Sequence, residues 1–333
     1  MASSVNKAFE EFLKGTVNLD QDIVSVARKS RDNLLNNIAE FGGKDGFFKL
    51  WKDMNIQFGS FARKTKCREL DDIDLMICIN AEGATYENFW NTWNNIYIHA
   101  SSDNDAQKSC IDDYNHLSST KVLNLFKKKL EELPEYSRSE INRHGEAIVL
   151  NLKSKDWSFD IVPCFHTVQE SDGRSYYLIP NGNGDWKKTD PAIDRDHIIQ
   201  TNQSHDGKVL ELIRLVKKWN KVKNAHTMPS YLLETMLINY CDSENNLADY
   251  IDMRFRDALK YIHDNIGNDI YDLKEIQGNI NDLRLADRMI IANKAKADYE
   301  KASSAISFEI NNEVKKSFTK WGEIFGSDFP KYG

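Results

Sequence analysis

A glycine turn ahead of two aspartates is the part of the sequence whose residue types and spacing could do chemistry. Ile56 and Phe58 end an apolar run, and Gly59 lets the backbone turn sharply because it has no side chain. Ser60 follows at the start of a predicted helix, where its hydroxyl and the nearby N–H groups can face an anion. The turn therefore predicts a phosphate-binding position.

Asp72 and Asp74 lie at the head of a predicted buried strand that runs from Leu75 to Ile79. Side chains alternate between the two faces of a strand, so these two carboxylates project to the same side, about 7 Å apart. Two carboxylates beside a phosphate-binding turn suit a complex of magnesium with a nucleoside triphosphate. Aspartate pairs at loop–strand junctions are also common on solvated surfaces, so these residues alone leave both interpretations open.

Asp160 is a third acidic residue, placed inside the otherwise apolar predicted strand 157–162. Burying a single carboxylate there is costly unless it is paired or bound to a metal. This strand and the preceding one, 143–152, form a predicted hairpin, and antiparallel pairing would bring Asp160 beside the first acidic strand. Three carboxylates can hold two Mg²⁺ ions, which activate an attacking hydroxyl and neutralise a departing pyrophosphate.

The composition bounds the class of protein to which these residues belong. A chain of 333 residues with 41% hydrophobic and 29% charged residues is typical of a soluble globular protein with one bilobal unit or two domains. We expect a cytoplasmic protein without a membrane segment, because no signal pattern, long apolar run or C-x-x-C pair occurs. The net charge of −7 argues against constitutive binding of long nucleic acid.

Helices are predicted around these strands from the apolar periodicity. Segments 1–16, 18–42, 86–99 and 117–133 carry helical patterns, and Pro134 stops the last of them.

From about residue 194 the chain is almost wholly helical, with predicted helices that include 246–264, 282–301 and 303–326. One earlier helix has an apolar stripe made of Val209, Leu212, Ile213, Val216 and Trp219. This stripe predicts that Lys217 lies at its border with the ammonium at a cleft edge, and that Lys218 points toward solvent.

As a set, Gly-Ser, then Asp-x-Asp, then a distant strand Asp resembles the DNA polymerase β-like nucleotidyltransferases. The pattern is most similar to the branch that contains cyclic GMP-AMP synthase, oligoadenylate synthase and the bacterial CD-NTases. Segments outside the acidic core support this resemblance, namely 178–186, 189–191, 212–220 and 229–234. The resemblance covers about residues 20 to 265. The sequence departs from the family pattern at Arg63-Lys64-Thr65, where a small residue is usual.

The resemblance implies an α+β fold with two lobes. Residues 1–192 would form a nucleotidyltransferase lobe with N-terminal helices and a small mixed sheet, and residues 193–333 a helical lobe. It also implies that a long N-terminal helix bridges both lobes and that the active site lies in the cleft between them.

The resemblance further implies a role for each site residue. Asp72, Asp74 and Asp160 would be catalytic and would bind two Mg²⁺ ions, which Mn²⁺ can replace. The implied nucleotide-binding residues are Gln57, Gly59, Ser60, Lys217, Ser230 and Tyr231. Among these, Lys217 and Ser230 would contact the triphosphate, and Tyr231 would either stack on a base or pack in the core. The surrounding basic run would belong to the nucleotide pocket; it comprises Arg214, Lys217, Lys218, Lys221 and Lys223.

The implied activity is template-independent nucleotidyl transfer from nucleoside triphosphates, with ATP, GTP or both as substrates. The product would be a cyclic or short linear oligonucleotide second messenger, made in CBASS anti-phage defence and bound by a separate effector protein. Two alternatives remain open. One is a nucleotidyltransferase that modifies a protein, a small molecule or an RNA end, and the acidic charge weighs against RNA. The other is a non-catalytic nucleotide sensor, against which the three intact acids weigh.

Overall fold

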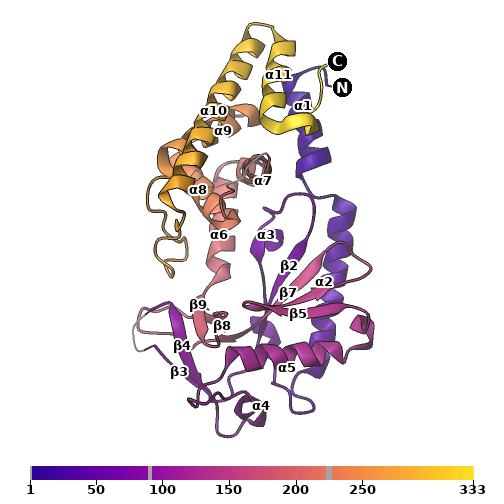
Figure 1. Ribbon diagram of the computed structural model, residues 1–333, viewed down its shortest axis with the longest axis vertical. Coiled ribbons are helices and arrows are strands. Elements are labelled where there is room, and N and C mark those ends of the chain that lie inside the picture. The colour runs from indigo at the N-terminus through magenta and orange to yellow at the C-terminus, as the bar shows by residue number, and fades with distance from the viewer. Residues whose placement is uncertain (1, 89–91, 223–226) are drawn as a thin grey trace. The chain divides into compact units, whose positions relative to one another are not determined.

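The chain forms two compact units in the computed structural model, which describes residues 2–88, 92–222 and 227–333 (Figure 1). The sheet unit comprises Gln21–Arg63 and Leu70–Arg195. The helical unit comprises Met1–Asp20, Lys64–Glu69 and Asp196–Gly333. A single boundary after residue 192 was predicted, and the compact units depart from it chiefly in the first twenty residues and in Lys64–Glu69.

A mixed sheet forms the centre of the sheet unit. Its strands among the described residues are β1 Ile56–Phe58, β2 Asp72–Cys78, β3 Thr85–Glu87, β4 Asn94–His99, β5 Glu140–His144, β6 Ala147–Asn151, β7 Ser158–His166, β8 Tyr177–Pro180 and β9 Trp186–Thr189. They lie in the order β1-β2-β7-β8-β9-β4-β3, and β6 pairs with both β5 and β7. The two strands that carry the acids, β2 and β7, are therefore neighbours, and β2 lies next to the edge strand β1.

Helices of the sheet unit cover and connect these strands. They are α2 Gln21–Phe41, α3 Gly59–Ala62, α4 Asp105–Lys108 and α5 Ser119–Glu131, with 3-10 turns η2 Lys52–Met54 and η3 Pro134–Tyr136. The side chain of Ser118 caps α5, and its buried face, which includes Val122 and Phe126, packs on β5 to β8 (Figure 1). The predicted helix 117–133 is thereby confirmed.

The predicted helix 86–99 is wrong, because the described residues of this segment form strands β3 and β4. Tyr86 pairs with Ile98 in antiparallel register, and Ile96 and Ile98 are buried at a spacing of two residues, which is the period of a strand. Residues 89–91 of that prediction lie outside the described residues. The segment is rich in aromatic and β-branched side chains, which favour strands, and this composition could have predicted β3 and β4.

The helical unit is built from α1 Val5–Phe12, α7 Lys208–Lys221, α8 Ser230–Ser243, α9 Ile251–Asn265, α10 Leu285–Ile310 and α11 Val314–Phe325, with the π-helical turn η1 Leu13–Val17 and the 3-10 turn η4 Gly326–Asp328. Helix α6, Pro191–Ser204, begins in the sheet unit and ends in the helical unit. Helix α10 has 26 residues, yet within the described ranges no helix is both long and apolar enough to cross a bilayer.

Aromatic packing explains why the first residues belong to the helical unit. The ring of Phe9 in α1 lies 4.9 Å from that of Trp321 and 5.1 Å from that of Phe329, measured between centroids. All three side chains are buried, so the N-terminal helix and the C-terminal segment lie side by side in one core (Figure 1).

The N-terminal helical pattern is two helices rather than one bridging helix. Helix α1 and its π-helical turn belong to the helical unit, and α2 belongs to the sheet unit. The helical conformation ends at Asn18, whose backbone is extended (φ −77°, ψ 145°). Asn18 pairs there with Cys67, and its carbonyl oxygen accepts a hydrogen bond from Arg68 Nε at 3.0 Å. The break between the predicted helical segments 1–16 and 18–42 is therefore confirmed, and a tertiary contact accompanies it.

The C-terminal helices are confirmed, but the break between the last two is at 311–313 and not near residue 302. Asn312 takes a positive φ of 60° after α10, a conformation that asparagine tolerates better than most residues.

Candidate active site

The three predicted catalytic acids lie on one face of the sheet. Strands β2 and β7 are parallel and in register, with Asp74 opposite Asp160 and Asp72 opposite Ser158. Directly paired residues project to the same face, so Asp72, Asp74 and Asp160 share it. Neighbouring strands lie about 4.8 Å apart, which makes Asp74 and Asp160 adjacent positions.

The predicted hairpin is confirmed as the antiparallel pair β6–β7, but β7 pairs with the acidic strand in parallel. Parallel neighbours need a long crossover connection. Here the chain between Cys78 and Ser158 supplies it and includes α5.

The two faces of β2 differ sharply, and this difference fixes the direction of the acids. Ile73 and Leu75 on one face are each 1% exposed, whereas Asp72 and Asp74 on the other are half-buried. A one-residue slip would exchange the two sets, so burial of the isoleucine and leucine side chains holds the register. Beyond the acids, the acidic face continues as an apolar cluster that includes Met76 and Val162.

Gly59 lies directly against the carboxylate of Asp74. Its φ is +70°, and a Cβ atom at this position would lie 1.7 Å from Asp74 Oδ2 and 2.5 Å from Asp74 Cγ. Both the conformation and the close approach require glycine. The preceding residue, Phe58, pairs with Asp74, and Ser60 is the second residue of α3. The turn predicted from the sequence is thus confirmed and lies beside the acids.

Gln57 does not join this group. It pairs with Leu75, so alternation places its side chain on the face opposite to Asp74. Its Oε1 accepts a hydrogen bond of 2.6 Å from Arg31 Nη1 of α2. The nucleotide contact of Gln57 stays a prediction, and in this structure its side chain is paired with Arg31.

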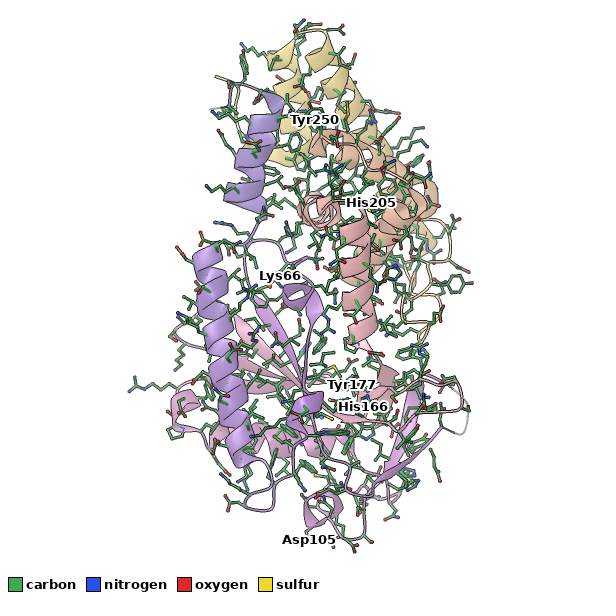
Figure 2. The ribbon with its side chains drawn as sticks, turned by 180° about the vertical axis from the view of Figure 1, so that it is seen from behind. Lys66, Asp105, His166, Tyr177, His205 and Tyr250 are labelled. Carbon is green, nitrogen blue, oxygen red and sulfur yellow. The ribbon has the colours of Figure 1, made fainter. Side chains whose placement is uncertain are left out.

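His166 lies on this sheet face too, at the far end of β7. It is six positions after Asp160, which is about 20 Å along a strand. Its ring meets that of Tyr177 edge-on at 5.0 Å (Figure 2). Burial lowers the pKa of His166, so the ring is neutral near pH 7. The distance from the acids and the contact with Tyr177 describe a packing residue.

Lys217 was predicted at the border of an apolar stripe, and this position is wrong. The five stripe residues are buried as predicted, but the side chain of Lys217 is itself only 6% exposed. Its Nζ donates to Glu234 Oε1 of α8 at 2.7 Å. Because Leu215 and Asn220 are buried too, α7 is covered well beyond one stripe. A border lysine has no place on such a helix; this one is retained by its carboxylate partner.

Two further members of the basic run, Arg214 and Lys218, also make contacts inside the helical unit. Arg214 donates from Nε to Asn18 Oδ1 at 2.7 Å and from Nη1 to the carbonyl oxygen of Lys64 at 2.8 Å. Lys218 donates to Asp328 Oδ2 at 3.0 Å. The assignment of Arg214 to a nucleotide pocket stays a prediction, and Lys223 lies outside the described residues.

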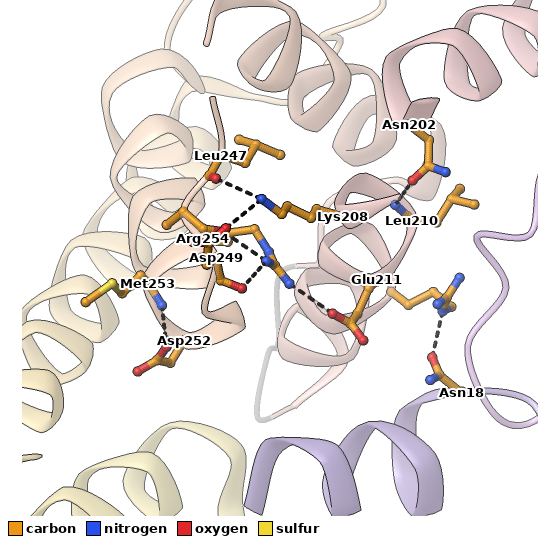
Figure 3. A network of polar contacts seen from close by, with 12 residues as sticks. Asn18, Asn202, Lys208, Leu210, Glu211, Leu247, Asp249, Asp252, Met253 and Arg254 are labelled. Carbon is orange, nitrogen blue, oxygen red and sulfur yellow. Dashed lines mark hydrogen bonds and ion pairs between the residues drawn. The ribbon is translucent and has the colours of Figure 1, made fainter. Parts of the chain in front are cut away.

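Other cations of the helical unit are also paired with carboxylates, as Figure 3 shows for a neighbouring network. There the buried Arg254 donates to Glu211 Oε2 at 2.9 Å, and Lys208 donates to Asp249 Oδ1 at 2.9 Å. A lysine or arginine in this unit is thus weak evidence for an anion site.

Ser230 and Tyr231 begin α8, directly after Pro229 (φ −52°). Ser230 is exposed, and Tyr231 is half-buried. The phenol of Tyr231 donates to Asp272 Oδ1, and Lys274 Nζ lies 4.1 Å from the centre of its ring. Tyr231 therefore belongs to a polar cluster and is not buried in an apolar core. Its role in stacking on a base stays a prediction.

Asp272 and Lys274 were not identified from the sequence as partners of Tyr231. Their spacing of two residues in a loop was the only available indication that they form a pair. Both are almost fully buried, and Lys274 Nζ donates to Asp272 Oδ1 at 2.8 Å. Burial alone would raise the pKa of Asp272, but hydrogen bonds from Lys274 and Tyr231 outweigh it and lower that pKa. The aspartate is thus ionised and fixes the orientation of the Tyr231 ring.

The chemistry of the acidic face suits a hard cation, since Mg²⁺ prefers carboxylate oxygens. As their side chains stand, no three histidine, cysteine, aspartate or glutamate residues in the described part of the chain form a cluster that could hold a metal ion. The backbone register nevertheless places Asp74 and Asp160 side by side, so convergence on an ion requires rotation of side chains and not movement of strands.

No family model matches the chain. It is 37% identical, over its full length and 99% of the relative, to a probable cyclic nucleotide synthase of Bacillus cereus (strain VD146). It is 25% identical, over 59% of its length and 56% of the relative, to the cyclic AMP-AMP-AMP synthase of Acinetobacter sp. (strain ATCC 27244 / 9458).

Two solved structures share the fold over nearly the whole chain. That of E. coli MS115-1 CdnC with ATP has a TM-score of 0.71 and 16% identity, and covers 98% of both chains. That of the CdnC:HORMA-deltaN complex has a TM-score of 0.69 and 17% identity, again with 98% of both chains covered.

The mixed sheet and the match to CdnC show the polymerase β-like nucleotidyltransferase fold, which confirms the predicted fold class. Within that class, the chain belongs to the bacterial CD-NTases, the cyclic nucleotide synthases. It is an enzyme of cyclic oligonucleotide synthesis.

Proposed function

We propose that the enzyme joins nucleoside triphosphates into a cyclic oligonucleotide second messenger at the acidic face of β2 and β7. The observation that carries this assignment is the in-register pair Asp74–Asp160, with Gly59 packed against the Asp74 carboxylate. Because the Asp74 carboxylate leaves no room for a side chain at residue 59, the turn and the acids form one site.

Asp72, Asp74 and Asp160 hold the divalent ions, Mg²⁺ or in its place Mn²⁺. When bound, these ions supply activation of the acceptor hydroxyl and neutralisation of the departing pyrophosphate. The chain's own residues bind and orient the substrates. The Ser60 hydroxyl and the amides of the Gly59 turn orient the terminal phosphates, and the buried opposite face of β2 keeps the acids directed at them.

The proposed contacts of the helical unit are Ser230 and Tyr231. Ser230 is exposed at the start of the fourteen-residue helix α8, where N–H groups and the helix dipole favour an anion. The Tyr231 ring, oriented by Asp272 and Lys274, is the proposed stacking surface for a base. Stacking of this kind contributes about 1–3 kcal/mol. Lys217 and Gln57 are omitted from the proposed contacts, since one is buried against Glu234 and the other lies on the opposite sheet face.

ATP, GTP or both are the proposed substrates, in keeping with the ATP named with CdnC. We place the enzyme in the cytoplasm, because all five cysteines are unbridged and buried. We also propose a role in anti-phage signalling, in which a separate effector protein binds the product. The HORMA partner belongs to CdnC and is not transferred to this chain.

Incubation with the four labelled nucleoside triphosphates and Mg²⁺ or Mn²⁺, then phosphatase treatment and mass spectrometry, tests the proposal. A phosphatase-resistant oligonucleotide with no terminal phosphate is the expected result. Transfer of a nucleotide to protein, a small molecule or an RNA end would instead identify the first alternative. Tight triphosphate binding without any product would identify a sensor.

A further inference from the structure

The six residues Lys64–Glu69, called the strap below, connect the glycine turn of the proposed site to its first acidic strand. Helix α3, which contains the turn, ends at Ala62, and β2 begins at Asp72. The strap nevertheless belongs to the helical unit, while the residues on both sides of it belong to the sheet unit. The helical unit therefore holds the chain at the point where the turn ends and the acidic strand begins.

Backbone pairing is the first set of contacts that holds the strap. The N–H of Arg68 donates to the carbonyl oxygen of Val17 at 2.9 Å, and Cys67 pairs with Asn18 in antiparallel fashion. Arg68 Nε donates to the carbonyl oxygen of Asn18 at 3.0 Å. The segment thus runs along the end of the N-terminal helix as a short strand does.

Helix α7 supplies the second set through Arg214. Its Nη1 donates to the carbonyl oxygen of Lys64 at 2.8 Å, and its own carbonyl oxygen accepts from Cys67 Sγ at 3.2 Å. Burial raises the pKa of the Cys67 thiol, which keeps it protonated as a donor.

A buried carboxylate makes the third contact. Thr65 is fully buried, and its Oγ1 donates to Glu234 Oε2 at 2.9 Å. The other oxygen of Glu234 accepts from Lys217 Nζ. Glu234 therefore links the strap to α7, through charge-assisted bonds that are stronger and more directional than those between neutral groups. Connecting loops normally run over the surface and contact water, so a buried link of this kind needs a reason.

The geometry points to Thr65 and Glu234 as positioning residues for nucleotidyl transfer. They hold the strap and thereby set the placement of the glycine turn relative to the acids of β2, without touching substrate or metal. This role rests on the proposed function. A misplacement of about 1 Å in such a site can cost about a hundredfold in rate.

Substitution of Thr65 tests the inference with a matched control elsewhere in the same unit. Thr201 is also buried, and its hydroxyl also donates to a carboxylate, Asp242 Oδ1, at 2.8 Å. We expect Thr65→Val to lower kcat by about tenfold or more, Thr65→Ser to restore it to within about threefold, and Thr201→Val to leave it within about twofold. Melting curves should show that both valine variants are folded at the assay temperature, and Thr65→Val should lose more stability because Glu234 is 2% exposed and Asp242 is 39% exposed. Equal kcat in Thr65→Val and Thr201→Val would overturn the inference.

Hydrogen exchange without nucleotide gives a second readout that needs no product. Peptides that cover residues 56–63 and 70–76 should exchange faster in Thr65→Val than in the parent. In Thr201→Val the exchange rates of these peptides should equal those of the parent. Should Thr65→Val not fold, Arg214→Met removes the bond to Lys64 and should accelerate the same peptides. Parent-like exchange in both variants would refute the positioning role. A parent without any product would instead refute the proposed function, while exchange still decides the role of the strap.

Discussion

The positions of the acids in the sheet unit and of Lys217 in the helical unit were both predicted from the periodicity of side chains along one element. The prediction for Asp72 and Asp74 is confirmed, and the prediction for Lys217 is wrong. Strand alternation placed Asp72 and Asp74 on a common face, and the structure agrees. Helix periodicity placed Lys217 at a border, and the structure buries it against Glu234. A strand offers a residue only two directions, whereas the environment around a helix varies with each 100° step and with whatever packs there.

The two regions also differ in how they treat charge. The acids are half-buried and share a face with a glycine turn, an arrangement that leaves them within reach of an added cation. Lys217 and Glu234 neutralise each other in the core, at a desolvation cost that their attraction must offset. Removing the charges of the acids should therefore abolish catalysis, whereas removing the charge of Lys217 should lower the free energy of unfolding.

The largest expected effect is on catalysis by the acidic face. The double variant Asp72→Asn, Asp74→Asn should fold normally but lose at least about a thousandfold in rate, equivalent to about 4 kcal/mol, because it loses its divalent ions. Product formation measured by mass spectrometry checks this. Asp156→Asn, in the exposed turn between β6 and β7, is the control and should remain active. Activity of the double variant within tenfold of the parent would contradict the assignment.

Stability should respond most at the buried lysine. We expect Lys217→Met to lower the free energy of unfolding by about 3 kcal/mol, because it leaves the Glu234 carboxylate buried without its ammonium partner. Lys218→Met breaks a pair whose aspartate is 54% exposed and should cost less than about 1 kcal/mol. Urea denaturation of both variants measures the difference. Equal costs would show that Lys217 is no more deeply paired than its neighbour, and partial recovery in Lys217→Met, Glu234→Gln would support the pairing.

Two glycines with the same backbone conformation sharpen the comparison within the sheet unit. Gly46 has a φ of +73° with nothing within 4 Å of the position that a Cβ atom would take, whereas Gly59 has a φ of +70° and meets Asp74. Both alanine variants should lose about 1–2 kcal/mol of stability from the left-handed conformation. Only Gly59→Ala should also displace Asp74 and lower kcat, by about tenfold or more. Steady-state rates of the two variants decide this, and equal rates would separate the turn from the acids.

The last expected effect is a thermal shift that depends on metal. A non-hydrolysable triphosphate at one hundred times its Kd should stabilise the parent by about 2.7 kcal/mol in the presence of Mg²⁺. Removal of the metal with EDTA should abolish most of this shift, because the ligand binds as a metal chelate. Differential scanning calorimetry in both buffers provides the measurement. An equal shift in EDTA would mean that the acids are not metal ligands.

Much of the site could be predicted because it depends on local rules. The alternation of β2, the need for glycine at residue 59 and the hairpin before Asp160 follow from residue types and from spacings of a few positions. The same holds for the apolar stripe of α7 and the helical character of the chain after residue 194. In each case the deciding interactions lie within one element or between sequence neighbours.

Contacts between distant segments decided the rest. The parallel pairing of β2 with β7 depends on a crossover of about eighty residues, whose path no local pattern specifies. The end of the N-terminal helix at Asn18 depends on Cys67, Arg68 and Arg214, which approach from two other parts of the chain. The burial of Lys217 depends on Glu234, seventeen positions away, and Glu234 in turn is bound by Thr65. A charge can lie in a core only where folding supplies its partner, so the sequence of α7 determines that Lys217 is cationic, and the tertiary structure alone determines that it is buried.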